Sequence, residues 1–174
     1  GAIDRVVSGT RYRVSCSLPM RQVDAHTFLV ESGNDSILEF SLSFSEAASA
    51  PLSDPGSIRK SSSDYWPMFW MSGGMVDFSG STHPMAPKLE QRMVLSQYLT
   101  AVQCVSDIPA QEGGLTCNTW YGKHHTEMIW WHNAHFILWG RTSLAERNLA
   151  WFVRRLPDAR TLAESRGLKG ARWA

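Results

Sequence analysis

The chain has 174 residues, of which 43% are apolar and 19% are charged, a balance typical of a globular protein rather than a disordered one. Its net charge is +1, so it has no basic field that would attract nucleic acid or an anionic membrane surface. No apolar run is long enough to span a bilayer. The chain does not start with methionine and has no secretion signal, and we expect it to be part of a longer polypeptide.

The N-terminal quarter has the alternation of apolar and polar residues that is typical of β-strands. Residues 11–18 and 37–44 both alternate with period two, which predicts strands with one buried face and one solvated face. A third, shorter strand is predicted at residues 27–30, before a turn rich in Ser, Gly, Asn and Asp. We therefore expect residues 1–45 to form antiparallel sheet at the edge of a β-sandwich.

Residues 46–63 are rich in Ser, Ala and Pro, and this composition predicts a linker. Within it, Asp54 and Pro55 have the residue types of a helix N-cap and first position. A helical segment follows in which Trp66, Phe69 and Trp70 share a face, until two glycines at residues 73–74 end it.

The rest of the chain has helical periodicity. Helices are expected at residues 88–105 and 125–140. A capping box at Ser143 and Glu146 predicts the start of a third helix, and a fourth, short helix is expected from Pro157 to Gly167. Glu90 and Arg92 are interpreted as a solvated face. The predicted fold class is therefore α+β, with a β domain (1–45), a linker (46–63) and a helical domain (64–174).

The three cysteines, Cys16, Cys104 and Cys117, lack metal-type spacing and leave one thiol unpaired in any disulfide scheme, so we expect buried free thiols. The chain also has eight tryptophans, which predicts large pockets or large cores.

Residues 109–135 interleave aromatic rings with ionisable groups, and this mixture is typical of a binding pocket. The candidate binding and catalytic residues of this pocket wall are Gln111, Glu112, Asn118, Trp120, Lys123, His125, Glu127, Trp131 and His132.

These residue types fit a sugar ligand. Trp120 precedes the expected helix, where its ring is available to stack on an apolar sugar face, whereas most tryptophans within the helix are expected in the core. The polar groups of Gln111, Asn118 and Lys123 suit hydroxyl groups. His125 and Glu127 would lie in the first helical turn, and both types can transfer protons. The alternative is that Glu127 only complements the helix dipole and the histidines are hydrogen-bonded core residues.

No metal or other cofactor is expected. His125 and His132 are roughly 10.5 Å apart along a helix axis, whereas zinc ligands must all lie about 2 Å from one ion. Only His132 and His135 could share a metal, and a third ligand would have to come from elsewhere.

Residues 89–141 resemble a segment of glycoside-hydrolase-like proteins of the six-hairpin superfamily, in which a β-sandwich precedes an (α/α)6 barrel. The sequence HTEM at residues 125–128, followed by Trp130 and Trp131, is also similar to the Asn-Thr-Glu-Met-Asn-Tyr-Trp motif of family 95 α-L-fucosidases. The loop at residues 109–115 matches their Pro-Ala-Asn-Leu-Gln-Gly loop. The resemblance implies that both segments line a sugar pocket. It also implies that His125 stands where an Asn helps to activate the attacking water.

The resemblance further implies a fragment of an enzyme that hydrolyses glycosidic bonds of an oligosaccharide. It would hold the last sandwich strands and the first helices of an incomplete barrel, whose uncovered apolar faces would leave the isolated chain inactive or prone to aggregation. The general acid would lie beyond residue 174, in the rest of the parent polypeptide. Glu127, or else Glu112, would be one of the two carboxyl groups that glycosidases need. Two alternatives stay open: a non-catalytic carbohydrate-binding or scaffold protein, and a metallohydrolase that uses His132 and His135.

Overall fold

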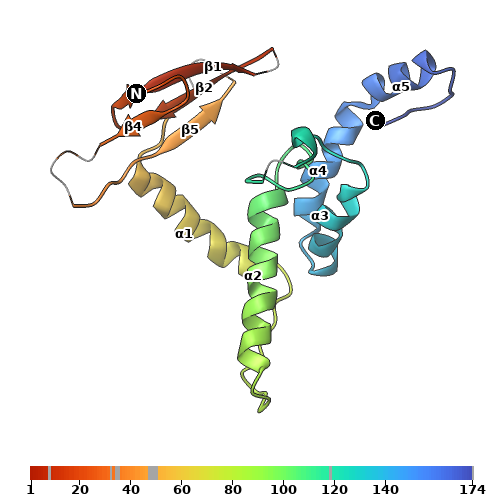
Figure 1. Cartoon of the computed structure of the whole chain (residues 1–174). Helices are drawn as coiled ribbons and strands as arrows, with labels where there is room; N and C mark the ends of the chain where they lie inside the picture. The colour runs from red at the N-terminus through yellow and green to blue at the C-terminus, as the bar shows by residue number, and fades with distance from the viewer. Residues whose placement is uncertain (8, 32, 34–35, 47–50, 118, 174) are drawn as a thin grey trace. The chain divides into compact units, whose positions relative to one another are not determined.

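The computed structural model describes all residues except 8, 32, 34–35, 47–50, 118 and 174. The chain divides into two compact units, Gly1–Met68 and Phe69–Ala174. Antiparallel strands in two small sheets come first, and five α-helices follow (Figure 1). The predicted α+β class is therefore confirmed.

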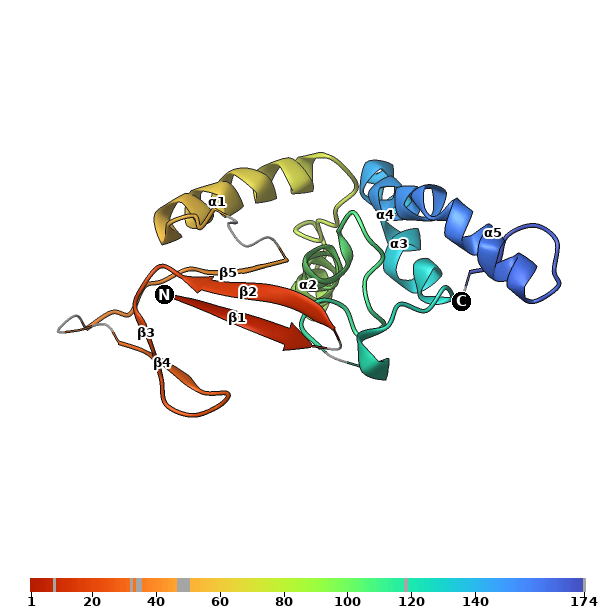
Figure 2. The same ribbon diagram turned by 90° about the horizontal axis from the view of Figure 1, so that it is seen from above.

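Two antiparallel sheets form the β part of the first unit. Strands β1 (Ala2–Val7), β2 (Thr10–Cys16) and β5 (Leu42–Ser45) form one sheet in the order β1-β2-β5. Strands β3 (Met20–Gln22) and β4 (Phe28–Val30) pair with each other in the second sheet (Figure 2). In the larger sheet, Val14 lies opposite both Ile3 and Phe44, and such apolar cross-strand pairs stabilise a sheet.

The strand predictions are correct in part. Strands β2 and β4 are confirmed, whereas β1 and β3 were not predicted. The strand expected at residues 37–44 begins only at Leu42. The prediction of a buried apolar face is wrong for β5, because Phe44 is 70% exposed. The alternation of apolar and polar residues correctly predicted that residues 42–44 are extended, but it did not predict the exposure of Phe44.

Helix α1 (Pro55–Met71) begins at the predicted proline. Asp54 caps it, since its Oδ1 accepts a hydrogen bond from the backbone N of Ser57 at 3.0 Å. Residues 55–63, which belong to the expected linker, are therefore helical. Serine is a moderate helix former and no glycine or proline interrupts Ser57–Trp66, so the serine-rich composition is compatible with a helix. The division between the two units falls within this helix.

The second unit contains helices α2 (Ala86–Cys104), α3 (Met128–Leu138), α4 (Thr142–Arg154) and α5 (Leu156–Ser165). Helix α3 contacts both α2 and α4 (Figures 1 and 2). The fully buried ring of Phe136 and side chain of Asn148 lie in its core. Asn148 donates hydrogen bonds to the carbonyl oxygens of Cys104 and Ser106, at 3.1 and 2.9 Å, and so ties α4 to the end of α2.

All four helices were predicted, but two of their starts were not. Helix α3 begins at Met128 rather than at residue 125, so His125 lies before the helix. The prediction of a capping box at Ser143 and Glu146 is wrong, because α4 begins at Thr142 and no side chain forms a capping hydrogen bond there. Among the described helices, none is both long enough and apolar enough to cross a membrane.

The thiol prediction holds for two of three cysteines. All three are free, and Cys16 and Cys104 are buried, but Cys117 is exposed. Cys117 lies in the loop between α2 and α3.

Candidate functional site

The loop between α2 and α3 folds back on itself and brings its two ends together. The backbone N of Glu112 donates to the carbonyl oxygen of Lys123 at 3.2 Å. The middle of the loop is held against α2, because the backbone N of Thr116 donates to Oε1 of Gln103 at 3.0 Å. Glu112 and the residues that follow Lys123 are therefore neighbours in space.

The backbone is left-handed at residues 120–122, near the end of the loop that precedes α3. Trp120, Tyr121 and Gly122 have φ values of 47°, 61° and 68°, and the first two are not glycines. Such a conformation costs roughly 1–2 kcal/mol for each residue that carries a Cβ. It leaves the ring of Tyr121 90% exposed and that of Trp120 61% exposed. The loop thus presents two large aromatic rings to solvent.

The closest contact between candidate residues joins Glu112 and His125. Nδ1 of His125 lies 3.0 Å from Oε2 of Glu112, with side-chain exposures of 41% and 24%. The ring of Trp120 lies 5.8 Å from the imidazole, centroid to centroid. With Glu112 ionised, Nδ1 donates its proton to the carboxylate, and Nε2 keeps a lone pair. This arrangement can accept a proton from a bound water or hydroxyl group beside an aromatic surface.

Two further histidines hold the loop in place. Nε2 of His132, which is 8% exposed, lies 3.2 Å from the carbonyl oxygen of Glu112. Nδ1 of His124 lies 3.0 Å from the carbonyl oxygen of Ala110. Burial lowers the pKa of His124, so its imidazole is neutral at neutral pH. These contacts fix the backbone on both sides of the Glu112–His125 pair.

The other candidate residues lie apart from this pair. Glu127 occupies the N-cap position of α3, is exposed, and makes no side-chain capping hydrogen bond. Trp131 is 67% exposed on α3. Lys123 is exposed, whereas Gln111 is half-buried and accepts a hydrogen bond from Gly114 through its carbonyl oxygen. Asn118 lies outside the described residues.

The structure therefore brings together Glu112, Trp120, His125 and His132 out of the candidates. The expectation that a helix start positions His124, His125 and Glu127 is wrong for both histidines, which precede α3. Among the residues that the structure describes, no group of three His, Cys, Asp or Glu side chains lies close enough to hold a metal ion.

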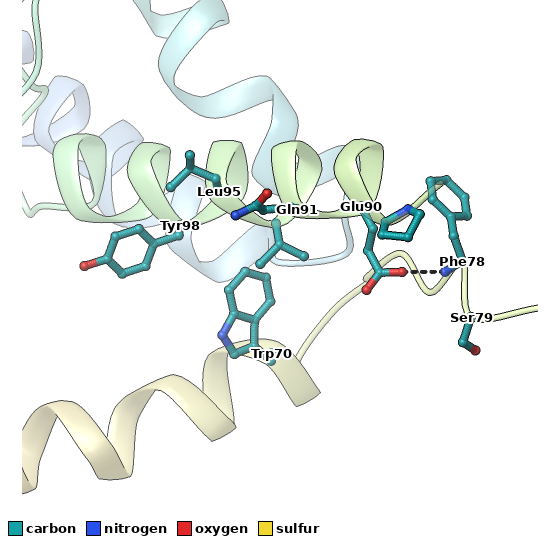
Figure 3. Close-up of a pocket in the computed structure, with 9 residues that line it drawn as sticks. Trp70, Phe78, Ser79, Glu90, Gln91, Leu95 and Tyr98 are labelled. Atoms are coloured by element: carbon teal, nitrogen blue, oxygen red, sulfur yellow. Dashed lines mark hydrogen bonds between the residues drawn. The ribbon is translucent and has the colours of Figure 1, made fainter. Parts of the chain in front are cut away.

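A hollow of about 590 Å³, which no sequence pattern indicated, lies beside α2. Figure 3 shows the ring of Trp70, at the end of α1, directed toward the face of α2 that carries Leu95 and Tyr98. Glu90 lies at its rim and accepts a hydrogen bond from the backbone N of Phe78 at 2.6 Å, so its interpretation as solvated surface is wrong. Helical periodicity in α2 is visible in the sequence, but the position of Trp70 beside Leu95 and Tyr98 depends on tertiary structure.

No protein-family model, no curated protein and no solved structure matches this chain.

Proposed function

We propose that this chain supplies the substrate-binding wall of a carbohydrate-active enzyme that hydrolyses glycosidic bonds of an oligosaccharide. In this proposal the small sheets are the end of an antiparallel β-sandwich and α1–α5 are the first helices of an (α/α)6 barrel. The rest of the barrel, with the general acid, belongs to the parent polypeptide. The observation that carries the proposal is the contact between Glu112 and His125 beside the ring of Trp120.

The pair has the chemistry for activating a water molecule. Glu112 accepts the Nδ1 proton of His125 and so fixes both the tautomer and the orientation of the ring. Nε2 then accepts a proton from the attacking water, the role that a carboxylate has in inverting glycosidases. The resemblance to family 95 α-L-fucosidases supports this role, since His125 stands at the position of their water-activating Asn. The imidazole would replace an amide that can only orient the water.

The aromatic side of the site suits a sugar ring. The exposed rings of Trp120 and Tyr121 offer flat apolar surfaces, and sugars present C–H groups on such surfaces. Lys123 and Gln111 lie within the same loop and carry the donors and acceptors that hydroxyl groups require. The left-handed turn that exposes the two rings is unfavourable for non-glycine residues, and such backbone conformations often occur at functional sites.

Binding is tested on the complete polypeptide by titration with a panel of neutral methyl glycosides, measured by calorimetry for every variant and also through the indole ¹⁵N resonance of Trp120 where that residue is present. We expect a saturable shift for at least one sugar. His125→Ala, Glu112→Gln and Trp120→Ala should each weaken binding by about tenfold or more. The exposed residues His26, Glu164 and Trp130 provide matched controls, and His26→Ala, Glu164→Gln and Trp130→Ala should leave affinity unchanged. A chain that binds none of the sugars contradicts the proposal.

Hydrolysis is tested on the complete polypeptide with the same three site variants. Loss of turnover in His125→Ala, with folding and sugar affinity retained, supports the role in activating water. Glu127→Gln tests the remaining carboxyl group, and unchanged turnover in that variant removes Glu127 from the chemistry.

The second candidate is a non-catalytic carbohydrate-binding protein on the same frame. Glu127 favours it, because this carboxylate is exposed and, within the described residues, forms no hydrogen bond or ion pair with Glu112 or His125. The pair therefore holds one carboxylate, that of Glu112. Sugar binding by the complete polypeptide without any hydrolysis distinguishes this function from the first.

A further inference from the structure

A second pocket lies against the same loop segment that carries His125. It has a volume of about 290 Å³, and His124 and Thr126 line it. His125, which lies between these two residues in the chain, contacts Glu112 instead. Neighbouring side chains of one short segment therefore belong to two sites, so a ligand in the pocket is adjacent to the proposed sugar site.

Aromatic side chains form much of the pocket wall. Trp151 and Phe152 come from α4, and Trp173 comes from the segment after α5. The rings of Phe152 and Trp173 meet edge to face at 5.2 Å, and those of Trp151 and Trp173 lie 6.3 Å apart. This volume is at the lower end of the range for small-molecule sites, so it suits a single ring rather than an extended ligand.

The charged groups of the pocket leave one positive charge in excess. Arg155 pairs with Asp158 at 3.0 Å, so these two charges neutralise each other. His124 is neutral, for the reason given above. Arg172 also lines the pocket and is anchored by its backbone N, which donates to the carbonyl oxygen of Ala159 at 2.9 Å. Its guanidinium makes no ion pair with the part of the chain that the structure describes, and it can bind a carboxylate through two parallel hydrogen bonds.

We infer that this pocket binds a uronic acid residue of the glycan, with Arg172 holding the carboxylate and the aromatic wall contacting the sugar ring. The inference rests on the proposed function, because it assigns a second sugar unit to the same substrate. An acidic sugar combines the two features that the pocket offers together, an apolar ring face and one negative charge. A neutral sugar leaves Arg172 unused, and a small inorganic anion leaves the aromatic wall unused.

The test uses the complete polypeptide and follows the indole ¹⁵N resonances of Trp151 and Trp173, which report on the pocket separately from Trp120. Methyl β-D-glucuronide should shift them at concentrations about tenfold lower than methyl β-D-glucoside does. Arg172→Gln should remove this preference. Arg160→Gln, which changes an exposed arginine of α5 that does not line the pocket, should retain it. Salt at about 1 M should weaken glucuronide binding, since the Debye length is then about 3 Å.

Equal responses to glucuronide and glucoside, or an unchanged preference in Arg172→Gln, would overturn the inference. An equal response to acetate would also overturn it, because the pocket would then recognise only an anion. The two proposals fail separately. Shifts of Trp173 with glucuronide but none of Trp120 with any sugar contradict the Glu112–His125 site alone, and the reverse pattern contradicts the pocket alone.

Discussion

Nη1 of Arg141 donates a hydrogen bond to Oε1 of Gln97 at 2.9 Å, and the two residues are only 3% and 5% exposed. The same guanidinium donates to the carbonyl oxygens of Phe69 and Gly74, at 3.0 and 3.1 Å. It also lies 4.2 Å from the centre of the Phe69 ring. One side chain at the start of α4 therefore connects the end of α1, the segment that follows it, and α2. These contacts make Arg141 an internal support of the helical unit that carries both proposed sites.

Replacing Arg141 with methionine should destabilise the chain by about 2–4 kcal/mol, because two buried acceptors and one partly buried acceptor lose their donor. The measurement is the midpoint of urea unfolding followed by circular dichroism. Arg141→Lys should recover only part of the loss, since an ammonium group cannot reproduce the planar set of donors. Arg160→Met, at an exposed arginine, is the control and should change stability by less than about 0.5 kcal/mol. Equal midpoints for the Arg141 and Arg160 variants would contradict this role.

Gly73 packs against Arg141 so closely that a side chain does not fit. A Cβ at this position would overlap the carbonyl oxygen of Trp139 and lie 2.7 Å from Cγ of Arg141. Gly73→Ala should therefore cost about 1–3 kcal/mol, as overpacking of a rigid contact does. Gly80→Ala is the matched control, because a Cβ there meets nothing within 4 Å, and it should be neutral or slightly stabilising. The free energy of unfolding of each variant, compared with that of the wild type, measures the effect. A Gly73→Ala variant as stable as the wild type would contradict the prediction and show that the backbone relaxes.

Local signals were sufficient for the parts of the fold in which a few adjacent residues decide the structure. Asp54 and Pro55 predicted the start of α1 correctly, and alternation predicted β2. The predicted start of α3 at residue 125 is wrong. Residues 125–127 have helical periodicity in the sequence, but His125 contacts Glu112 from a distant part of the loop and lies outside the helix. Tertiary contacts of this kind override local propensity.

The candidate site was predicted as a set of residues but not as an arrangement. Glu112 and His125 were each assigned a chemical role, yet nothing in the sequence paired them. Their contact depends on a left-handed turn at Trp120 and Tyr121, and bulky residues are among the poorest signals for positive φ. Trp131 is of a residue type typical of binding pockets, but it lies exposed on α3. In the part of the chain that the structure describes, no hydrogen bond or ring contact joins it to Glu112 or His125.

The left-handed turn should carry a measurable energetic cost. Tyr121 has φ of 61° and is 90% exposed, so its ring contributes little packing within this chain. Tyr121→Asn should stabilise the chain by about 0.5–1 kcal/mol, because Asn tolerates this conformation better. Tyr121→Val should destabilise it, since a β-branched residue tolerates positive φ worst. Chemical unfolding of both variants gives the comparison, and a destabilised Tyr121→Asn variant would mean that the ring packs more than its exposure indicates.

His135 should make stability depend on pH. Burial lowers its pKa from 6.5 to about 4, and the positive charge of Arg141 acts in the same direction. The unfolded chain therefore binds more protons than the folded chain between these two values, and stability falls as pH drops from about 6.5 toward 4. Because the imidazole is only partly enclosed, we expect this residue to account for about 1–2 kcal/mol between pH 7 and pH 5.

His135→Phe removes the titration and keeps a ring against Phe136, whose centroid lies 3.8 Å from that of His135. Urea unfolding of this variant should show a smaller loss of stability on acidification than the wild type does. Part of the loss should persist, because the pKa of His124 is also lowered by burial. His26→Ala, at an exposed histidine, should follow the wild-type pH profile. Parallel profiles for wild type and His135→Phe would show that neither burial nor the charge of Arg141 lowers the pKa of His135 in the folded chain.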